Sequence, residues 1–305
     1  MEKKKPIEAG SNEFEMIEFI LDDAGVSNYY GINVAKVREV IKVPKITPVP
    51  KSHPCVEGFA DLRGNIIPII NISKWLGLNS KKDLNKVLIT EFNQTYNGFL
   101  VNDVTRIYRL TWNEVLQPAE MEADDEKNCI NAVVKMEDKM ILILDFEKIV
   151  GDIFPESFFK EEKNIIEGVN KELKILIAED SGIILKLIDK ALKKAGYKVY
   201  PASNGKIALD KLKELKNEAT EKGEPLSNFV DVVITDLEMP VMGGENLIKN
   251  MKEDKELSKL PIIVFSSMGL EENIRKLKAL GANEFINKPD VNILGEAIKR
   301  VLNLQ

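Results

Sequence analysis

Short apolar runs of strand length dominate the chain from about Glu13 to Val150. They include EMIEFIL, YYGINV, NIIPIINI, KVLITEF, AVVKM and MILIL, and turn residues separate them. Two pairs are predicted to form hairpins, because three polar residues join AVVKM to MILIL and five residues join VLITEF to GFLV. No amphipathic stretch of helix length dominates between these runs. The pattern therefore predicts an antiparallel barrel or sandwich over residues 13–150.

After Lys171 the pattern changes to an alternation of two kinds of segment. Strand-like runs such as LKILIA, FVDVVIT and LPIIVF alternate with amphipathic segments such as SGIILKLIDKALKKAG, whose apolar residues Ile184, Ile188 and Leu192 share one helical face. This alternation predicts a doubly wound α/β domain with five parallel strands over residues 173–304. The mostly charged stretch 151–172 is the expected linker between the two domains.

Length, composition and charge agree with this division and narrow the function. A chain of 305 residues with 44% hydrophobic content suits two globular domains. The start MEKKKPIEAG is followed by no apolar segment, and no run of 18 apolar residues occurs, so we expect a cytoplasmic protein without membrane insertion. Lys and Arg number 22 against 29 Asp and Glu in residues 1–172, and 21 against 20 thereafter, so neither half is a basic surface for nucleic acid.

The two cysteines carry no predicted chemistry. Cys55 and Cys129 lie far apart in the sequence, without CxxC spacing, and only His53 is near enough in sequence to be a co-ligand. This pattern supports neither a zinc site nor a disulfide framework. We expect both cysteines to be packed in the interior.

Polar residues end four of the predicted parallel strands. LKILIA ends on Glu179-Asp180, FVDVVIT on Asp236, LPIIVF on Ser266, and EFIN on Lys288. Ligands of doubly wound sheets sit at the carboxyl ends of the strands, so these side chains are expected to meet at one edge.

Three carboxylates in one pocket repel one another unless a divalent cation neutralises them. Magnesium is favoured because it is a hard cation that prefers oxygen ligands. We therefore predict a magnesium site formed by Glu179, Asp180, Asp236 and the carbonyl of Glu238. With the cation held there, the free oxygen of Asp236 can attack a phosphoryl group in line and form an aspartyl phosphate. Lys288 would neutralise the added charge, and Ser266 would donate its hydroxyl to a phosphoryl oxygen.

An enzymatic alternative uses similar residues. Asp-nucleophile phosphohydrolases of the haloacid-dehalogenase type also combine DxE after a strand with a later Ser and Lys. Their domain begins with the nucleophile and ends with the acidic pair, whereas here Glu179-Asp180 comes first and Asp236 ends the third strand. The order favours a phosphoacceptor protein over an enzyme.

Residues 173–304 resemble a two-component receiver domain in the acidic pair, the DxxMPxMGG segment, the Ser and the Lys-Pro. The resemblance implies that Asp236 takes phosphate from a histidine kinase, and that Ser266 and Phe285 then move together as a switch. Two features depart from the family. Glu179 stands where Asp is at least as common, and KNEATEKGEPLSNF is longer than receivers carry there and is expected to be a surface insertion.

Residues 13–150 contain no catalytic set, which favours a binding function. They contain Val37-Arg38-Glu39-Val40, then Asp61-Leu62-Arg63-Gly64, then an Ile-x-Pro-Ile strand around Pro68. We expect Gly64 to allow a tight turn from which Arg63 projects, and Pro68 to lie in an edge strand. These motifs resemble the coupling-protein domain of bacterial chemotaxis, the CheW-like domain, which folds as two small β-barrels and binds both the receptor tip and the histidine kinase. The resemblance implies a partner surface that includes Val37, Glu39, Leu62, Arg63 and Gly64.

A coupling domain followed by a receiver resembles the CheV architecture over nearly the whole chain. That family links methyl-accepting chemoreceptors to the histidine kinase CheA at membrane-associated receptor arrays. The implied function is an adaptor whose coupling is tuned by magnesium-dependent phosphorylation of Asp236. Two alternatives stay open: a constitutive scaffold with a non-regulating receiver, and a receiver that acts mainly as a phosphate sink.

Overall fold

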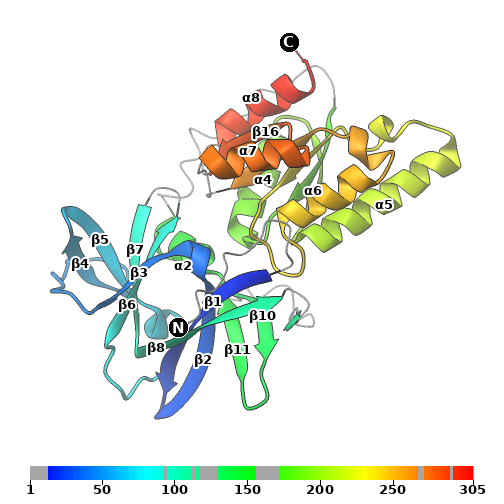
Figure 1. Cartoon of the computed structure of the whole chain (residues 1–305). Coiled ribbons are helices and arrows are strands. Elements are labelled where there is room, and N and C mark those ends of the chain that lie inside the picture. Colours follow the sequence, from blue (N-terminus) through cyan, green and yellow to red (C-terminus); the bar gives the residue numbers. More distant parts are fainter. Residues whose placement is uncertain are drawn as a thin grey trace. The chain divides into compact units, whose positions relative to one another are not determined.

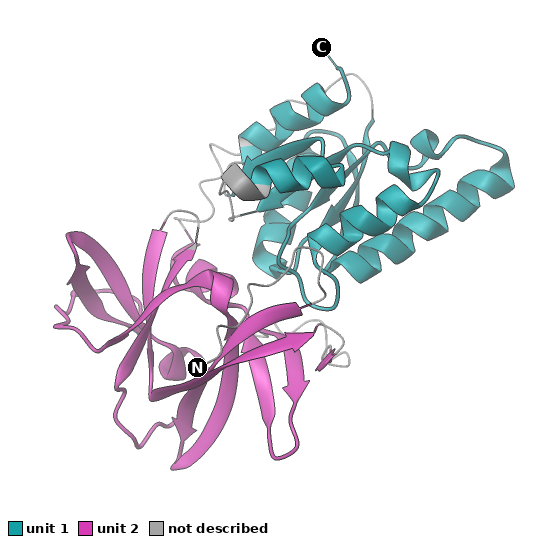
Figure 2. Ribbon diagram, in the orientation of Figure 1, with its two compact units in different colours: residues 1–12, 156–305 teal, residues 13–155 magenta. Residues whose placement is uncertain are grey.

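The chain divides into two compact units (Figure 2). One is Glu13–Pro155, and the other is described from residue 172 onward. The computed structural model describes residues 13–92, 95–111, 114–116, 129–155, 172–266, 271–288 and 291–304. Most of the expected linker, residues 156–171, lies outside the described residues.

The first sheet of the N-terminal unit is antiparallel except where β2 and β11 run parallel. Both faces of β1 are buried: Met16 packs inside this sheet, while Phe19 packs on Phe146 of helix α2 at 5.9 Å between ring centroids. This explains why five of the seven residues of EMIEFIL are apolar. The strands in sheet order are β8 (Asp103–Thr111), β1 (Glu13–Asp23), β2 (Val26–Asn33), β11 (Met140–Leu144), β10 (Ile130–Lys135) and β9 (Val115–Leu116).

The second sheet has its own core and meets the first through α2 (Phe146–Ile153). Phe146 also packs against Phe99 of β7, with ring centroids 4.7 Å apart, so one aromatic ring joins the two sheets. The boundary predicted at residue 150 falls inside this helix. The strands in sheet order are β3 (Val37–Lys42), β6 (Lys86–Phe92), β7 (Thr95–Val101), β5 (Asn65–Asn71) and β4 (Val56–Leu62), with η1 (Val34–Lys36) and α1 (Ile72–Trp75) beside them.

The two sheets share one connectivity. In each sheet, two hairpins are joined by parallel pairing of their second strands: β2 of the β1–β2 hairpin pairs with β11 of β10–β11, and β7 of β6–β7 pairs with β5 of β4–β5. A short helix follows β11 and β5. Asn71 begins α1 and donates its N–H to the carbonyl of Cys55, and Asp145 begins α2 and does the same with Cys129. Cys55 and Cys129 are both buried, as predicted. The N-terminal hairpin completes a sheet whose other strands come late in the unit.

Two local predictions for this unit were wrong. The loop after VLITEF is shorter than five residues, because β7 begins at Thr95 and Thr95 pairs with Phe92. Pro68 does not lie in an edge strand, because β5 is placed between β7 and β4. Proline is tolerated there since pairing with β7 begins only at Ile69, and β4 alone lies opposite Pro68. The three-residue connection between β10 and β11 is confirmed within one residue.

The second unit is the predicted doubly wound domain. Its five strands are all parallel, in the order 2-1-3-4-5 counted within the unit, so the chain reverses its winding direction between β12 and β14. In β12, the first strand of this unit in the sequence, every side chain after Lys174 is buried, which fits a sheet covered on both faces. The strands in sheet order are β13 (Lys198–Ala202), β12 (Lys174–Ala178), β14 (Val232–Thr235), β15 (Ile262–Ser266) and β16 (Glu284–Asn287).

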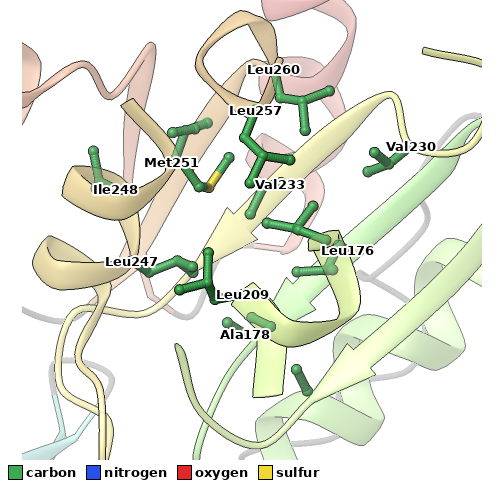
Figure 3. Packing of buried hydrophobic residues seen from close by; sticks show 14 of the residues in the cluster. Leu176, Ala178, Leu209, Val230, Val233, Leu247, Ile248, Met251, Leu257 and Leu260 are labelled. Atoms are coloured by element: carbon green, nitrogen blue, oxygen red, sulfur yellow. The ribbon is translucent and has the colours of Figure 1, made fainter. Parts of the chain in front are cut away.

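Helices cover both faces of this sheet (Figure 1). α4 (Gly182–Lys194) and α8 (Val291–Val301) pack on one face, and the alternate strand residues face α5 (Gly205–Lys222), α6 (Gly244–Glu253) and α7 (Glu271–Leu280) on the other. Figure 3 shows the second core, where Leu176 and Val233 of the strands meet Leu209, Leu247 and Met251 of the helices. Two short 3₁₀ turns, η3 (Leu226–Asn228) and η4 (Leu257–Lys259), lead into β14 and β15.

The stretch KNEATEKGEPLSNF is only partly a surface insertion. Its first half continues α5 to Lys222, where Gly223 ends the helix in a left-handed conformation, with φ of 66°. Ala219, Leu226 and Phe229 are buried in the core of the second unit. The extra length therefore adds core contacts as well as exposed surface.

Candidate functional site

The predicted acidic residues meet at the carboxyl edge of β12 and β14. Asp236 donates its N–H to the carbonyl of Ala178, the last residue of β12, so the pairing of the two strands continues past their ends. Glu179 follows Ala178 directly and is next to Asp236 in space. Ligand oxygens of Glu179, Asp180 and Asp236 all lie within 4.8 Å of one another. The edge lies at the position where the winding direction reverses, which is where doubly wound sheets bind ligands.

Lys288 enters this cluster from the end of β16. Its ammonium lies 2.9 Å from Oδ2 of Asp236 and 2.7 Å from Oε2 of Glu179, and all three side chains are buried. Its backbone N–H donates to the carbonyl of Ser266. Three carboxylates and one ammonium leave a net charge of −2 at this edge.

This donor set fits a divalent cation. The ligand atoms are carboxylate oxygens, which hard cations such as Mg²⁺ prefer, and the net charge of −2 matches the charge of such an ion. Glu238 lies half-buried two residues after Asp236. The role of the Glu238 carbonyl as a ligand of the cation stays a prediction.

Ser266 and Phe285 lie on one face of the sheet. Phe285 is paired with Val264 of β15, and Ser266 follows Val264 by two residues, so their side chains point to the same side. Ser266 is buried, and Phe285 is half-buried against the core that α5, α6 and α7 cover. A coupled movement of the two side chains stays a prediction.

The loop after Asp236 is folded back onto the strand end. Gly244 donates its N–H to the carbonyl of Leu237, and a Cβ atom on Gly244 would lie 2.1 Å from the carbonyl oxygen of Asp236. Asp236 Oδ1 accepts the N–H of Leu237 at 2.7 Å. The glycine is therefore needed for close packing of backbone against backbone, and the Leu237 N–H holds one oxygen of the Asp236 side chain.

The predicted partner residues of the first unit divide into two groups. Arg63 and Gly64 form a two-residue turn between β4 and β5, both with positive φ, and Arg63 Nη2 lies 2.9 Å from Oε2 of Glu39. The Arg63 side chain is 79% exposed despite this contact. Leu62 packs partly against the core of the second sheet, and Val37 is half-buried at the start of β3. The fold thus brings Arg63 and Glu39 together, while their part in partner binding stays a prediction.

Comparisons with known proteins match both units. The CheW-like domain matches residues 18–154, and the response regulator receiver domain matches residues 175–299. The chemotaxis protein CheV3 of Helicobacter pylori is 32% identical over 302 residues, which cover 96% of each chain.

The chain belongs to the CheV family of chemotaxis proteins.

Two further relatives agree with this membership. CheV1 of Helicobacter pylori is 31% identical over 316 residues and covers 96% of this chain and 95% of its own, and the chemotaxis protein CheW of Thermotoga maritima is 32% identical over 142 residues, which are 46% of this chain and 90% of that protein. The predicted fold, a CheW-like domain followed by a receiver with five parallel strands, is confirmed. The membership supports a role as a chemotaxis coupling adaptor. None of the helices described here is both long and apolar enough to span a bilayer.

One buried charge pair of this CheV-family chain was not predicted. Glu18, in the middle of EMIEFIL, is 1% exposed and lies 2.6 Å from the ammonium of Lys139, at the β10–β11 turn. The hydroxyls of Thr105 and Tyr108 also donate to its carboxylate. An acid flanked on both sides by apolar residues was the available signal, but its partner lies in a hairpin far along the sequence.

Proposed function

We propose that this chain couples methyl-accepting chemoreceptors to the histidine kinase CheA, and that phosphorylation of Asp236 in the presence of Mg²⁺ tunes this coupling. The observation that carries the proposal is the convergence of Glu179, Asp180, Asp236 and Lys288 at one sheet edge, in a chain that also has a CheW-like domain. A switchable receiver fused to a binding domain suits an adaptor whose contacts are regulated.

The residues of the site have separable roles in phosphate transfer. The Leu237 N–H and Lys288 hold the two oxygens of Asp236, so its carboxylate is oriented before the donor arrives. The phosphorus–nitrogen bond of the kinase phosphohistidine breaks as a phosphorus–oxygen bond to Asp236 forms. Mg²⁺, held by Glu179, Asp180 and Asp236, would supply positive charge to the phosphoryl oxygens.

Lys288 and Ser266 then stabilise the product. The ammonium of Lys288 already contacts Asp236 and has a short distance to travel to a phosphoryl oxygen on the same carboxylate. The Ser266 hydroxyl, at the end of the neighbouring strand, donates to another phosphoryl oxygen. Phe285 lies on the same face as Ser266, and its side chain moves together with that of Ser266, which changes the surface near β16.

Phosphotransfer to the full-length chain tests the proposal directly. Radiolabelled CheA phosphohistidine in Mg²⁺ is expected to label the wild type and not Asp236→Asn. The matched control is Asp231→Asn, the same change at the other end of the same strand, where an amide oxygen can still accept the Lys174 N–H as Asp231 does. Equal labelling of the wild type and Asp236→Asn would contradict the proposal.

The two alternative functions are separated by kinase activity in reconstituted receptor arrays. A tuned adaptor gives different kinase activity with and without a phosphodonor, and Asp236→Ala removes this difference. A constitutive scaffold gives the same activity in all four conditions. A phosphate sink gives rapid phosphotransfer from CheA with little change in coupling.

A further inference from the structure

Both carboxylate oxygens of Glu179 are already bonded to donors of the chain. Lys288 Nζ lies 2.7 Å from Oε2 and 2.9 Å from Oε1, and the backbone N–H of Ser181 donates to Oε1 at 3.2 Å. The side chains of Glu179 and Lys288 are 1% and 2% exposed. A carboxylate that satisfies a buried ammonium in this way has less capacity for a metal ion.

The length of the glutamate side chain makes this contact possible. The backbone of Glu179 is held by its N–H, which donates to the carbonyl of Ala202, so the position of its Cα is set by the sheet. An aspartate at this position is shorter by one carbon–carbon bond, roughly 1.5 Å. Its oxygens would then lie beyond hydrogen-bond distance of the present Lys288 position.

Lys288 is shared between two acids that have different tasks. It contacts Asp236, the proposed phosphoacceptor, through a single carboxylate oxygen at 2.9 Å, and Glu179 through both oxygens. Of the two ion pairs, the one with Glu179 has the larger number of contacts. Glu179 therefore determines where the ammonium rests before phosphorylation.

We propose that Glu179 is a positioning residue for Lys288, and that the divalent cation and Lys288 compete for the Glu179 carboxylate. Binding of the cation breaks a buried ion pair and releases Lys288 toward Asp236 and its phosphoryl group. Cation occupancy and the availability of Lys288 are thereby linked. The inference rests on the cation site of the proposed function, but not on phosphotransfer or on receptor coupling.

A double-mutant cycle measured with Mg²⁺ alone tests the competition. Isothermal titration calorimetry gives the Mg²⁺ affinity of the full-length wild type, Glu179→Asp, Lys288→Met and the double variant, without any phosphodonor. We expect Glu179→Asp to bind Mg²⁺ several-fold more tightly than the wild type. Lys288→Met should raise the Mg²⁺ affinity more in the wild-type background than in the Glu179→Asp background, because the ion pair is already lost in Glu179→Asp. The ratio of the two increases should be at least about fivefold.

Additive effects in this cycle would overturn the proposal, since simple repulsion between Lys288 and the cation acts equally in both backgrounds. Weaker Mg²⁺ binding by Glu179→Asp would also overturn it, because Glu179 would then be an ordinary ligand. Absence of Mg²⁺ binding in all four proteins would remove the competition altogether. Failure of phosphotransfer with a non-additive cycle would contradict the proposed function and leave this inference intact.

A spectroscopic measurement follows the ammonium itself. In the wild type without Mg²⁺, the ¹⁵N signal of the Lys288 ammonium should exchange slowly with water, because the group is buried between two carboxylates. Mg²⁺ should shift this signal, and Glu179→Asp should lose the slow exchange before any Mg²⁺ is added. The internal control is Lys252, whose ammonium donates to the Ser258 carbonyl away from the site and should not respond. A Lys288 signal that is unchanged in Glu179→Asp would overturn the proposal, even if Lys288→Met failed to fold.

Discussion

The two units bury carboxylates in different ways. In the CheW-like unit (Glu13–Pro155, the coupling unit), Glu18 contacts one ammonium, that of Lys139, and the hydroxyls of Thr105 and Tyr108 complete its hydrogen bonds. The Lys139 ammonium also lies 4.2 Å from the centre of the Tyr29 ring. One acid and one base cancel, and the partners come from the chain itself. We call this arrangement a closed pair, because its charges cancel, and we assign it a role in the stability of the unit.

In the receiver, three carboxylates meet one ammonium. Glu179, Asp180 and Asp236 together exceed Lys288 by two negative charges. Glu179 and Asp236 are buried and Asp180 is half-buried, so this excess of negative charge is costly unless a cation binds, and it indicates a binding site. The comparison shows that the balance of charge, rather than burial of a carboxylate alone, distinguishes a site from a structural ion pair.

Removal of the base from the closed pair should have the largest effect on stability. Lys139→Met leaves Glu18 buried without its counter-charge and is expected to destabilise the coupling unit by about 3 kcal/mol. Both tryptophans of the chain, Trp75 and Trp112, belong to this unit, so tryptophan fluorescence during urea unfolding follows it selectively. Lys135→Met, at an exposed position of the same hairpin, should change stability by less than about 0.5 kcal/mol.

The same pair predicts a pH dependence with a definite sign. Desolvation lowers the pKa of Lys139, but its hydrogen bonds and charge interactions with Glu18 and Tyr108 outweigh this and raise the pKa above 10.5. Between neutral pH and pH 10.5 the contribution of this pair is therefore fully present, and it is lost as the pH rises through the raised value. If Lys139→Met has wild-type stability at neutral pH, the pair is not a stabilising one.

Added Mg²⁺ should stabilise only the unit with the charge excess. At a Mg²⁺ concentration 100 times the Kd, the receiver should gain about 2.7 kcal/mol, because the ion binds only the folded state. Circular dichroism at 222 nm reports mainly on this unit, which contains the long helices of the described chain. The fluorescence midpoint of the coupling unit should not move. An equal rise of both midpoints would show a general salt effect instead.

Conversion of an acid to its amide should have opposite signs in the two units. Asp180→Asn removes part of the repulsion at the receiver edge and should stabilise that unit by about 1 kcal/mol without Mg²⁺, while removing the Mg²⁺ response. Glu18→Gln leaves Lys139 without its counter-charge and should destabilise the coupling unit. Changes in stability of the same sign in both variants would contradict the distinction between the closed pair and the acidic edge of the receiver.

An exposed ion pair supplies the smallest expected change in stability. Arg63→Ala removes the contact with Glu39 at a side chain that is 79% exposed, so stability should fall by less than about 0.5 kcal/mol. Binding of CheA or receptor in a pull-down should weaken, while phosphotransfer to Asp236 stays unchanged, because the two sites belong to different units. Unchanged pull-down would remove Arg63 from the proposed partner surface.

Local pattern was sufficient for the order of elements and for most of the site. The ends of apolar runs placed Glu179, Asp236, Ser266 and Lys288 at one edge, because parallel strands in a doubly wound sheet share their direction. The same reasoning failed for Pro68, whose strand proved internal, and for the stretch KNEATEKGEPLSNF, in which Ala219, Leu226 and Phe229 are buried. Burial of these residues depends on neighbours that local periodicity does not reveal.

By itself, the sequence determined the two fold types, the turn at Gly64 and the set of acidic residues, since periodicity and turn chemistry act over a few residues. Only the tertiary structure decided which charges meet. Lys288 reaches Glu179 across 109 residues of sequence, and Lys139 reaches Glu18 from a hairpin in the same sheet. Side-chain reach and strand order set these distances, and both are products of long-range packing. These distances distinguish the Glu18–Lys139 pair, whose charges cancel, from the receiver edge, which keeps a net negative charge.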